Sequence, residues 1–239
     1  MKILTISGVI DRRMLVNFTI DADIARSIVP KPFTPKLIDG KAIAGICLIR
    51  LKQVRPKGLP ACMGIGSENG AHRIAVEWFD GGELKEGVYV PRRDTSSKFN
   101  SIVGGKLFPG KHYLATFDVN EDGNDFHVAF KSSDGTIISV DARLADEFPK
   151  KSIFKNIVNA SAFFKAGSVG YSPNNDKYEG LLLNTYNWEV KPLEVSKVIS
   201  SYFENETIFP KDSVQFDNAL LMTNIAHEWS SVLDKQVCV

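Results

Sequence analysis

The stretch 113–144, YLATFDVNEDGNDFHVAFKSSDGTIISVDARL, decides the fold class. Apolar and polar residues alternate along 113–119 and 126–130, and a third run of the same kind covers 136–144. This period of two indicates strands with one buried face. The segments between these runs are rich in Asn, Asp, Ser and Gly, and each is too short for a parallel crossover. The stretch therefore predicts an antiparallel meander.

Further strands are expected on both sides of the meander. Residues 42–51 are nearly all apolar, which is typical of a strand buried on both faces. The turn Asp80-Gly81-Gly82-Glu83 predicts a hairpin that leads into a strand ending at Val90. The remaining expected strands cover residues 3–10, 14–20, 72–79, 181–190 and 194–203.

Helical spacing of apolar residues occurs in only a few segments. The expected helices are a short one near 21–28 that Pro30 and Pro32 terminate, a longer one at 152–164, and a closing one at 214–233. Residues 55–70 contain too many Gly and Pro residues for regular structure, and residues 171–179 are expected to form a polar loop.

These elements predict a mainly β (α+β) fold. It consists of one antiparallel sheet system, curled or closed into a barrel, with a few flanking helices. Closure would remove the exposed edges that so large a sheet otherwise presents. Neither an internal repeat nor a low-complexity linker divides the sequence, so we expect a single domain over residues 1–239.

Composition argues against several classes of function. The formal net charge of +1 lacks the basic excess of nucleic-acid-binding proteins. No run approaches the roughly 18–20 apolar residues that span a bilayer, and the N-terminal apolar run lacks a signal-peptide cleavage site. Three cysteines without a CxxC and four scattered histidines give no zinc spacing. We expect no metal, no cofactor, no nucleic-acid or membrane partner, and a cytoplasmic location.

The densest group of basic side chains lies between two expected strands, within residues 87–119. Its members are Arg92, Arg93, Lys98, Lys106, Lys111 and His112. Loops that a rigid scaffold holds in place frequently carry chemistry. A solvated connection with ordinary surface charges is the competing interpretation, and the sequence leaves both open.

Four stretches carry a resemblance to a known family. They are Arg12-Arg13-Met14-Leu15-Val16 followed by FTIDADIARSIVPKPF, then Ser67-Glu68-Asn69-Gly70, then Phe108-Pro109-Gly110-Lys111, then PLEVSKVISSYFENETIFP with VQFDNAL. In this order they resemble the acetoacetate decarboxylase-like superfamily, including its uncharacterised conserved branch. The resemblance implies a closed β-barrel with flanking helices and an internal cavity for a small molecule, often in a homo-oligomer.

The resemblance also implies lysine chemistry. In the decarboxylase a lysine forms an imine with a β-keto acid, and desolvation or a neighbouring cation lowers the pKa of that lysine. The family's Pro-Lys-Lys is absent here. Either Pro91-Arg92-Arg93 takes its place, where arginine cannot form the imine, or Phe108-Pro109-Gly110-Lys111 does. The distance from Glu68 favours the second register, so Lys111 and Lys106 are the candidate catalytic amines.

Other residues receive expected roles from the same resemblance. Arg12 or Arg13 resembles the arginine that holds a substrate carboxylate, because a guanidinium presents a matching fork of donors. Only one of these neighbours can face a cavity if both lie on a strand. Glu68 resembles the cavity glutamate, with a role as a polariser or acid–base group.

The basic connection adds further candidates for substrate binding. Arg92 and Arg93 are candidates for an anion site at a strand end, and His112 and Tyr113 for contacts that include proton donation. Two functions stay open. One is a lyase-like enzyme acting on a small keto or carboxylic acid through a lysine imine. The other is a non-catalytic binding protein of the same fold, which the missing lysine pair favours.

Overall fold

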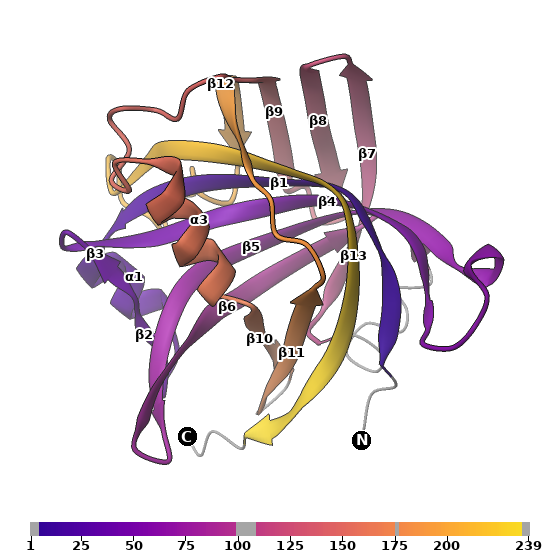
Figure 1. Ribbon diagram of the computed structural model, residues 1–239. Helices are drawn as coiled ribbons and strands as arrows, with labels where there is room; N and C mark the ends of the chain where they lie inside the picture. Colours follow the sequence, from indigo (N-terminus) through magenta and orange to yellow (C-terminus); the bar gives the residue numbers. More distant parts are fainter. Residues whose placement is uncertain (1–4, 99–108, 175–176, 236–239) are drawn as a thin grey trace.

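The computed structural model describes residues 5–98, 109–174 and 177–235, and strands dominate it (Figure 1). Its helical elements are α1 (Ala22–Ile28), a single 3-10 turn (Ala61–Met63) and α3 (Ile157–Ala166). Its strands are β1 (Ile6–Asp21), β2 (Thr34–Pro35), β3 (Leu37–Ile38), β4 (Lys41–Pro56), β5 (Ile65–Asp80), β6 (Glu83–Thr95), β7 (His112–Asp122), β8 (Asp125–Ser132), β9 (Ile137–Leu144), β10 (Val169–Asn174), β11 (Lys177–Thr185), β12 (Lys191–Ser200) and β13 (Val214–Lys235). Among the described residues, no helix is both long and apolar enough to cross a membrane.

All strands belong to one curled sheet. Its order is β11-β10-β6-β7-β8-β9-β12-β13-β1-β4-β5-β2, with β3 attached to β4. Two additional pairings, β11 with β13 and β5 with β6, turn the path back on itself. The bonding is therefore ring-like, as the expected curled and mainly β sheet requires.

The long strands β13, β1, β4, β5 and β6 form a wall with a separate core on each face. On one face the wall packs against β7, β8, β9 and β12, which project to the top of Figure 1. On the other face it packs against α3, which lies across β1, β4 and β5 in the same view. Because successive side chains of a strand point to opposite faces, neighbouring residues of the wall enter different environments.

Several sequence-based predictions are confirmed. The predicted meander is β7, β8 and β9, which pair antiparallel in sequence order. Residues 42–48 of β4 are all buried, as expected for a strand with two covered faces. The short helix is α1, and the Asp80–Glu83 hairpin joins β5 to β6.

The predicted closing helix at 214–233 is wrong, because this segment is the 22-residue strand β13. Ala219, Met222 and Ala226 have helical spacing, yet Leu220 and Leu221 between them are also buried. A strand covered on both faces needs apolar residues at nearly every position, so its sequence contains helical spacing by coincidence. Pairing with β1, β11 and β12 satisfies its backbone groups instead.

Four segments also differ from the prediction in their boundaries. The broken segment 55–70 contains the end of β4 and the start of β5, and the expected loop 171–179 contains parts of β10 and β11. Strand β6 continues to Thr95, so Arg92 and Arg93 lie on a strand and not on a loop. Helix α3 begins at Ile157, since the side chain of Asn156 accepts a hydrogen bond from the backbone N–H of Asn159 at 2.9 Å.

Candidate functional site

The strand pairing of β1, β4 and β5 places Arg12 and Arg13, the two predicted carboxylate anchors, in different rows of the sheet. Arg12 pairs across the sheet with Arg50, which in turn pairs with Glu68. Arg13 lies in the next row, which contains Ile49 and Asn69. The two rows point to opposite faces, so Arg12 and Arg13 reach different sites.

Arg12 and Glu68 belong to an ion-pair network on the face that packs against the meander. Arg12, only 2 % exposed, donates from Nη2 to Glu68 Oε2 at 2.6 Å and from Nη1 to Glu121. Arg50 donates from Nε to Glu68 Oε1 at 2.7 Å and contacts Glu121 and Asp11 as well. Although burial lowers the pKa of Arg50, hydrogen bonds to Glu68 and Glu121 outweigh it and raise that pKa. The carboxylates of the network are thus already neutralised within the protein.

Arg92 is also neutralised. It donates to Asp94 at 2.7 and 3.0 Å and to Asp134 at 2.6 and 2.9 Å. Its guanidinium lies 4.2 Å from the ring centroid of Tyr113. The exposed Lys111 places Nζ 4.6 Å from the same centroid. The structure therefore groups Arg92, Tyr113 and Lys111 together, while Lys106 lies outside the described residues.

Arg93 instead points into an inner cavity of about 70 Å³. This cavity lies between the wall, β7 and β11, and it is lined by Ile49, Leu51, Val54, Ile65, Ser67, Asn69, Gly70, Ala71, Arg93, Asp94, His112, Leu181 and Trp229. Arg93 Nε donates to the hydroxyl of the buried Ser172 at 3.1 Å, and no carboxylate of the described residues bonds to the guanidinium. Burial lowers the pKa of Arg93 to about 10, an effect that the nearby Cys47 opposes. The inner cavity therefore holds a cation without a counter-ion from the described residues.

His112 lies beside Arg93 in the inner cavity, because β6 and β7 run parallel and pair these two residues. Burial, together with the charge of Arg93, lowers the pKa of His112 to about 4. The imidazole is then neutral near pH 7. Its Nδ1 lies 3.1 Å from the carbonyl oxygen of Gly110, which can only accept, so Nδ1 carries the proton and Nε2 the lone pair.

Gly110 is needed for this arrangement. Its φ of +79° is a conformation that favours glycine, and a Cβ there would approach the Cβ of Ser172 to 2.7 Å. The glycine of the Phe-Pro-Gly-Lys turn therefore brings His112 and the hydrogen-bond partner of Arg93 together.

A second cavity lies between the wall and α3. Arg13, Arg73, Phe163 and Phe164 are among its lining residues. Arg73, only 4 % exposed, donates from Nη2 to Asn17 Oδ1 at 2.5 Å and lies over the ring of Phe164. Its Nε lies 3.1 Å from Cys47 Sγ.

The sequence did not identify Arg73, Cys47 or Ser172. In the expected strand 72–79, His72, Ile74 and Val76 alternate with Arg73 and Glu77, a pattern typical of a strand with Arg73 on the exposed face. Both faces of β5 are covered here, however, and both His72 and Arg73 are buried. The alternation of side chains along a strand was the available signal. Asn69 shares a row of the sheet with Arg13, and Arg73 lies four positions further along β5, so Arg73 points to the same face as Arg13.

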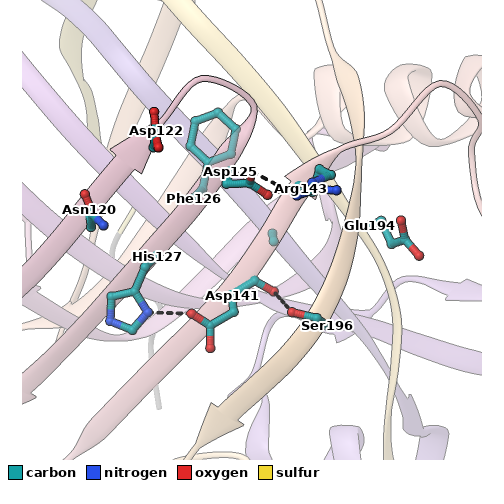
Figure 2. A pocket seen from close by; sticks show the side chains of 10 residues that line it. Asn120, Asp122, Asp125, Phe126, His127, Asp141, Arg143, Glu194 and Ser196 are labelled. Atoms are coloured by element: carbon teal, nitrogen blue, oxygen red, sulfur yellow. Dashed lines mark hydrogen bonds and ion pairs between the residues drawn. The ribbon is translucent and has the colours of Figure 1, made fainter.

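An outer groove of about 440 Å³ lies on the exposed side of β7, β8, β9 and β12. Figure 2 shows His127 directed at Asp141, with Nδ1 2.5 Å from Oδ1, and Arg143 directed at Asp125. None of the predicted site residues that the structure describes lines this groove. Across the described parts of the chain, no group of three or more His, Cys, Asp or Glu side chains is arranged to hold a metal ion.

The fold is similar to that of acetoacetate decarboxylase and related enzymes of known structure. Acetoacetate decarboxylase from Legionella pneumophila is 12% identical, with a TM-score of 0.59, covering 96% of this chain and 87% of that chain. An acetoacetate decarboxylase-like enzyme from Sphingomonas wittichii RW1 is 9% identical, with a TM-score of 0.60, covering 99% and 93%. The enduracididine biosynthesis enzyme MppR complexed with pyruvate is 11% identical, with a TM-score of 0.58, covering 98% and 90%. At these identities the likeness shows a shared fold.

The chain belongs to the DUF2071 family, described as an uncharacterized conserved protein, which it matches over residues 10–219. No curated protein is significantly similar to it in sequence. The expected resemblance to the acetoacetate decarboxylase-like superfamily, including its uncharacterised branch, is confirmed.

Proposed function

We propose that the inner cavity binds a small keto or carboxylic acid, with Arg93 as its carboxylate anchor. The observation that carries this proposal is a partly buried guanidinium in the cavity lining to which no carboxylate of the described residues bonds. Burying an unpaired charge is unfavourable, and a forked pair of N–H donors matches a carboxylate. A bound carboxylate would supply the missing counter-charge.

Two further observations support a ligand of this class. A cavity of about 70 Å³ has room for a few non-hydrogen atoms, which suits a small acid and not a nucleotide. Among structures of the same fold, MppR is described in complex with pyruvate and with the condensation product of pyruvate and imidazole 4-carboxaldehyde. Neutral His112 lies beside Arg93 in the lining of the same cavity.

We propose reversible binding as the primary activity, and the lysine imine stays a prediction. The amine of Lys111 lies over Tyr113 and is not among the groups lining the inner cavity. Borohydride reduction in the presence of acetoacetate or pyruvate, followed by peptide mapping, tests Lys111 and Lys106 directly. A reduced adduct on either lysine would establish the imine and replace the binding proposal with an enzymatic one. The expected homo-oligomer is tested separately by light scattering.

The binding proposal is tested by calorimetric titration with pyruvate, acetoacetate and the neutral ketone acetone. We expect the two acids to bind and acetone not to bind. Arg93→Met should weaken acid binding by about 10- to 150-fold, since hydrogen bonds to charged groups contribute about 1.5–3 kcal/mol. Arg143→Met is the control, because Arg143 is exposed and pairs with Asp125 far from the cavity. Unchanged affinity in Arg93→Met would refute the assignment.

A further inference from the structure

The second cavity borders on an unusual buried thiol. Cys47, only 3 % exposed, lies 3.1 Å from Arg73 Nε and 3.8 Å from Arg13 Nη2. No carboxylate of the described residues bonds to either guanidinium. Among the residues that the structure describes, Cys47 is thus the one ionisable group in contact with both arginines that can carry a negative charge.

These charges favour the thiolate. Burial opposes ionisation of a thiol, but the positive charges of Arg73 and Arg13 and their hydrogen bonds outweigh burial and lower the pKa of Cys47. The thiolate is the nucleophilic form of cysteine, and neighbouring arginines are a recognised cause of thiol reactivity.

The position of Cys47 brings it near both cavities. In the sheet it is paired with Leu15, which lines the second cavity, and with Ala71, which lines the inner cavity. Cys47 therefore lies in one row of the sheet between a lining residue of each cavity.

Arg13 supplies an independent indication of a ligand. Its Nε and Nη1 are buried donor atoms without a hydrogen-bond partner in the described structure, and Nη2 of the same guanidinium faces the sulfur. A small anion in the second cavity would satisfy these donors and lie next to Cys47.

We propose that Cys47 is a reactive thiolate site for small carboxylates that carry an electrophilic carbon, with Arg13 as the group that draws the carboxylate in. With a keto acid, a sulfur lone pair forms an S–C bond at the carbonyl carbon. The π electrons of the C=O bond move to oxygen, which takes a proton from water, giving a reversible hemithioketal without any oxidation or reduction. This goes beyond the function proposed for the inner cavity, which requires only Arg93.

Charge-selective alkylation tests this proposal, with the exposed Cys62 as an internal control. Folded protein at pH 7 is treated in parallel with anionic iodoacetate and neutral iodoacetamide, and each cysteine is quantified by mass spectrometry. The thiolate displaces iodide, which leaves with its electron pair. We expect the iodoacetate-to-iodoacetamide rate ratio to be at least about tenfold higher at Cys47 than at Cys62, because the guanidiniums concentrate anions. Millimolar pyruvate should slow labelling of Cys47 and leave Cys62 unchanged.

Variants separate this inference from the proposed function. Arg13→Gln should bring the rate ratio at Cys47 to that of Cys62, whereas Arg93→Met should leave the ratio high. Should Arg13→Gln fail to fold, the ratio in the unmodified protein and protection by pyruvate still decide. Absence of Cys47 labelling in the folded protein, or labelling without charge preference, would overturn the inference. If pyruvate binds by calorimetry yet does not protect Cys47, the inference fails and the proposed function stands.

Discussion

Arg92 and Arg93 are adjacent, yet replacing each by methionine should have opposite effects on the free energy of unfolding: Arg92→Met should lower it and Arg93→Met should raise it. Arg92 is bonded to Asp94 and Asp134, whereas Arg93 has no carboxylate partner among the described residues. Arg92→Met leaves Asp94, which is 1 % exposed, without its counter-charge. Breaking such a buried pair is expected to lower the free energy of unfolding by about 3–5 kcal/mol.

For Arg93→Met we expect a gain. Burial lowers the pKa of Arg93 from its ordinary value to about 10, and at about 1.4 kcal/mol per pKa unit this would be a cost of about 3 kcal/mol for the charged form. Part of the side chain stays accessible from the cavity, so screening reduces this to about 1–2 kcal/mol. Loss of the hydrogen bond to Ser172 offsets about 1 kcal/mol of it. The expected net effect is a gain of up to about 1 kcal/mol in unfolding free energy.

Urea unfolding of the two variants at pH 7, without ligand and with excess pyruvate, checks both signs. We expect excess pyruvate to stabilise the unmodified protein clearly more than it stabilises Arg93→Met, because stabilisation by a ligand grows with its affinity for the folded state. A loss of several kcal/mol in Arg93→Met, equal to that in Arg92→Met, would show that Arg93 is a structural ion-pair partner and refute the reasoning.

Two further predictions concern the wall. Gly45→Ala should lower the unfolding free energy by about 1–3 kcal/mol, since the added Cβ would lie 2.5 Å from the Val16 carbonyl oxygen. Gly167→Ala is the control, because the nearest atom to its added Cβ is 3.6 Å away. Equal urea-denaturation midpoints for the two variants would contradict the prediction. Burial lowers the pKa of His72 to about 3 and the pKa values of His227 and of His112 on β7 to about 4, below the ordinary 6.5, so the unfolded chain takes up protons first on acidification. Stability should therefore fall by up to about 4 kcal/mol per pH unit between about pH 6.5 and pH 4, and a flat urea-unfolding profile over this range would disprove it.

The sequence predicted the fold class because most strands have one covered face or an unbroken apolar run. It failed for β13, where residues 218–222 are all buried, so burial has no period of two. A long apolar segment of this kind fits a helix and a doubly covered strand equally well until its partners are known. The partners of β13 come from both ends of the chain, which local patterns do not reveal.

The candidate site could be predicted only in part. The sequence grouped Arg93 and His112 on one basic connection as candidates for substrate binding, and both residues line the inner cavity. It could not decide between Arg12 and Arg13, because an irregularity of pairing between Ile10 and Arg12 resets which residues of β1 face each core. Glu68 was grouped with the cavity residues from its local motif, whereas its row in the ladder sets it beside Arg12 and Arg50.

A crystal structure of the protein soaked with pyruvate or acetoacetate tests the central claim most directly. We predict that the carboxylate occupies the inner cavity, with its oxygens about 2.7–3.0 Å from the guanidinium nitrogens of Arg93. A keto acid bound elsewhere, with Arg93 and the inner cavity unchanged, would contradict the account.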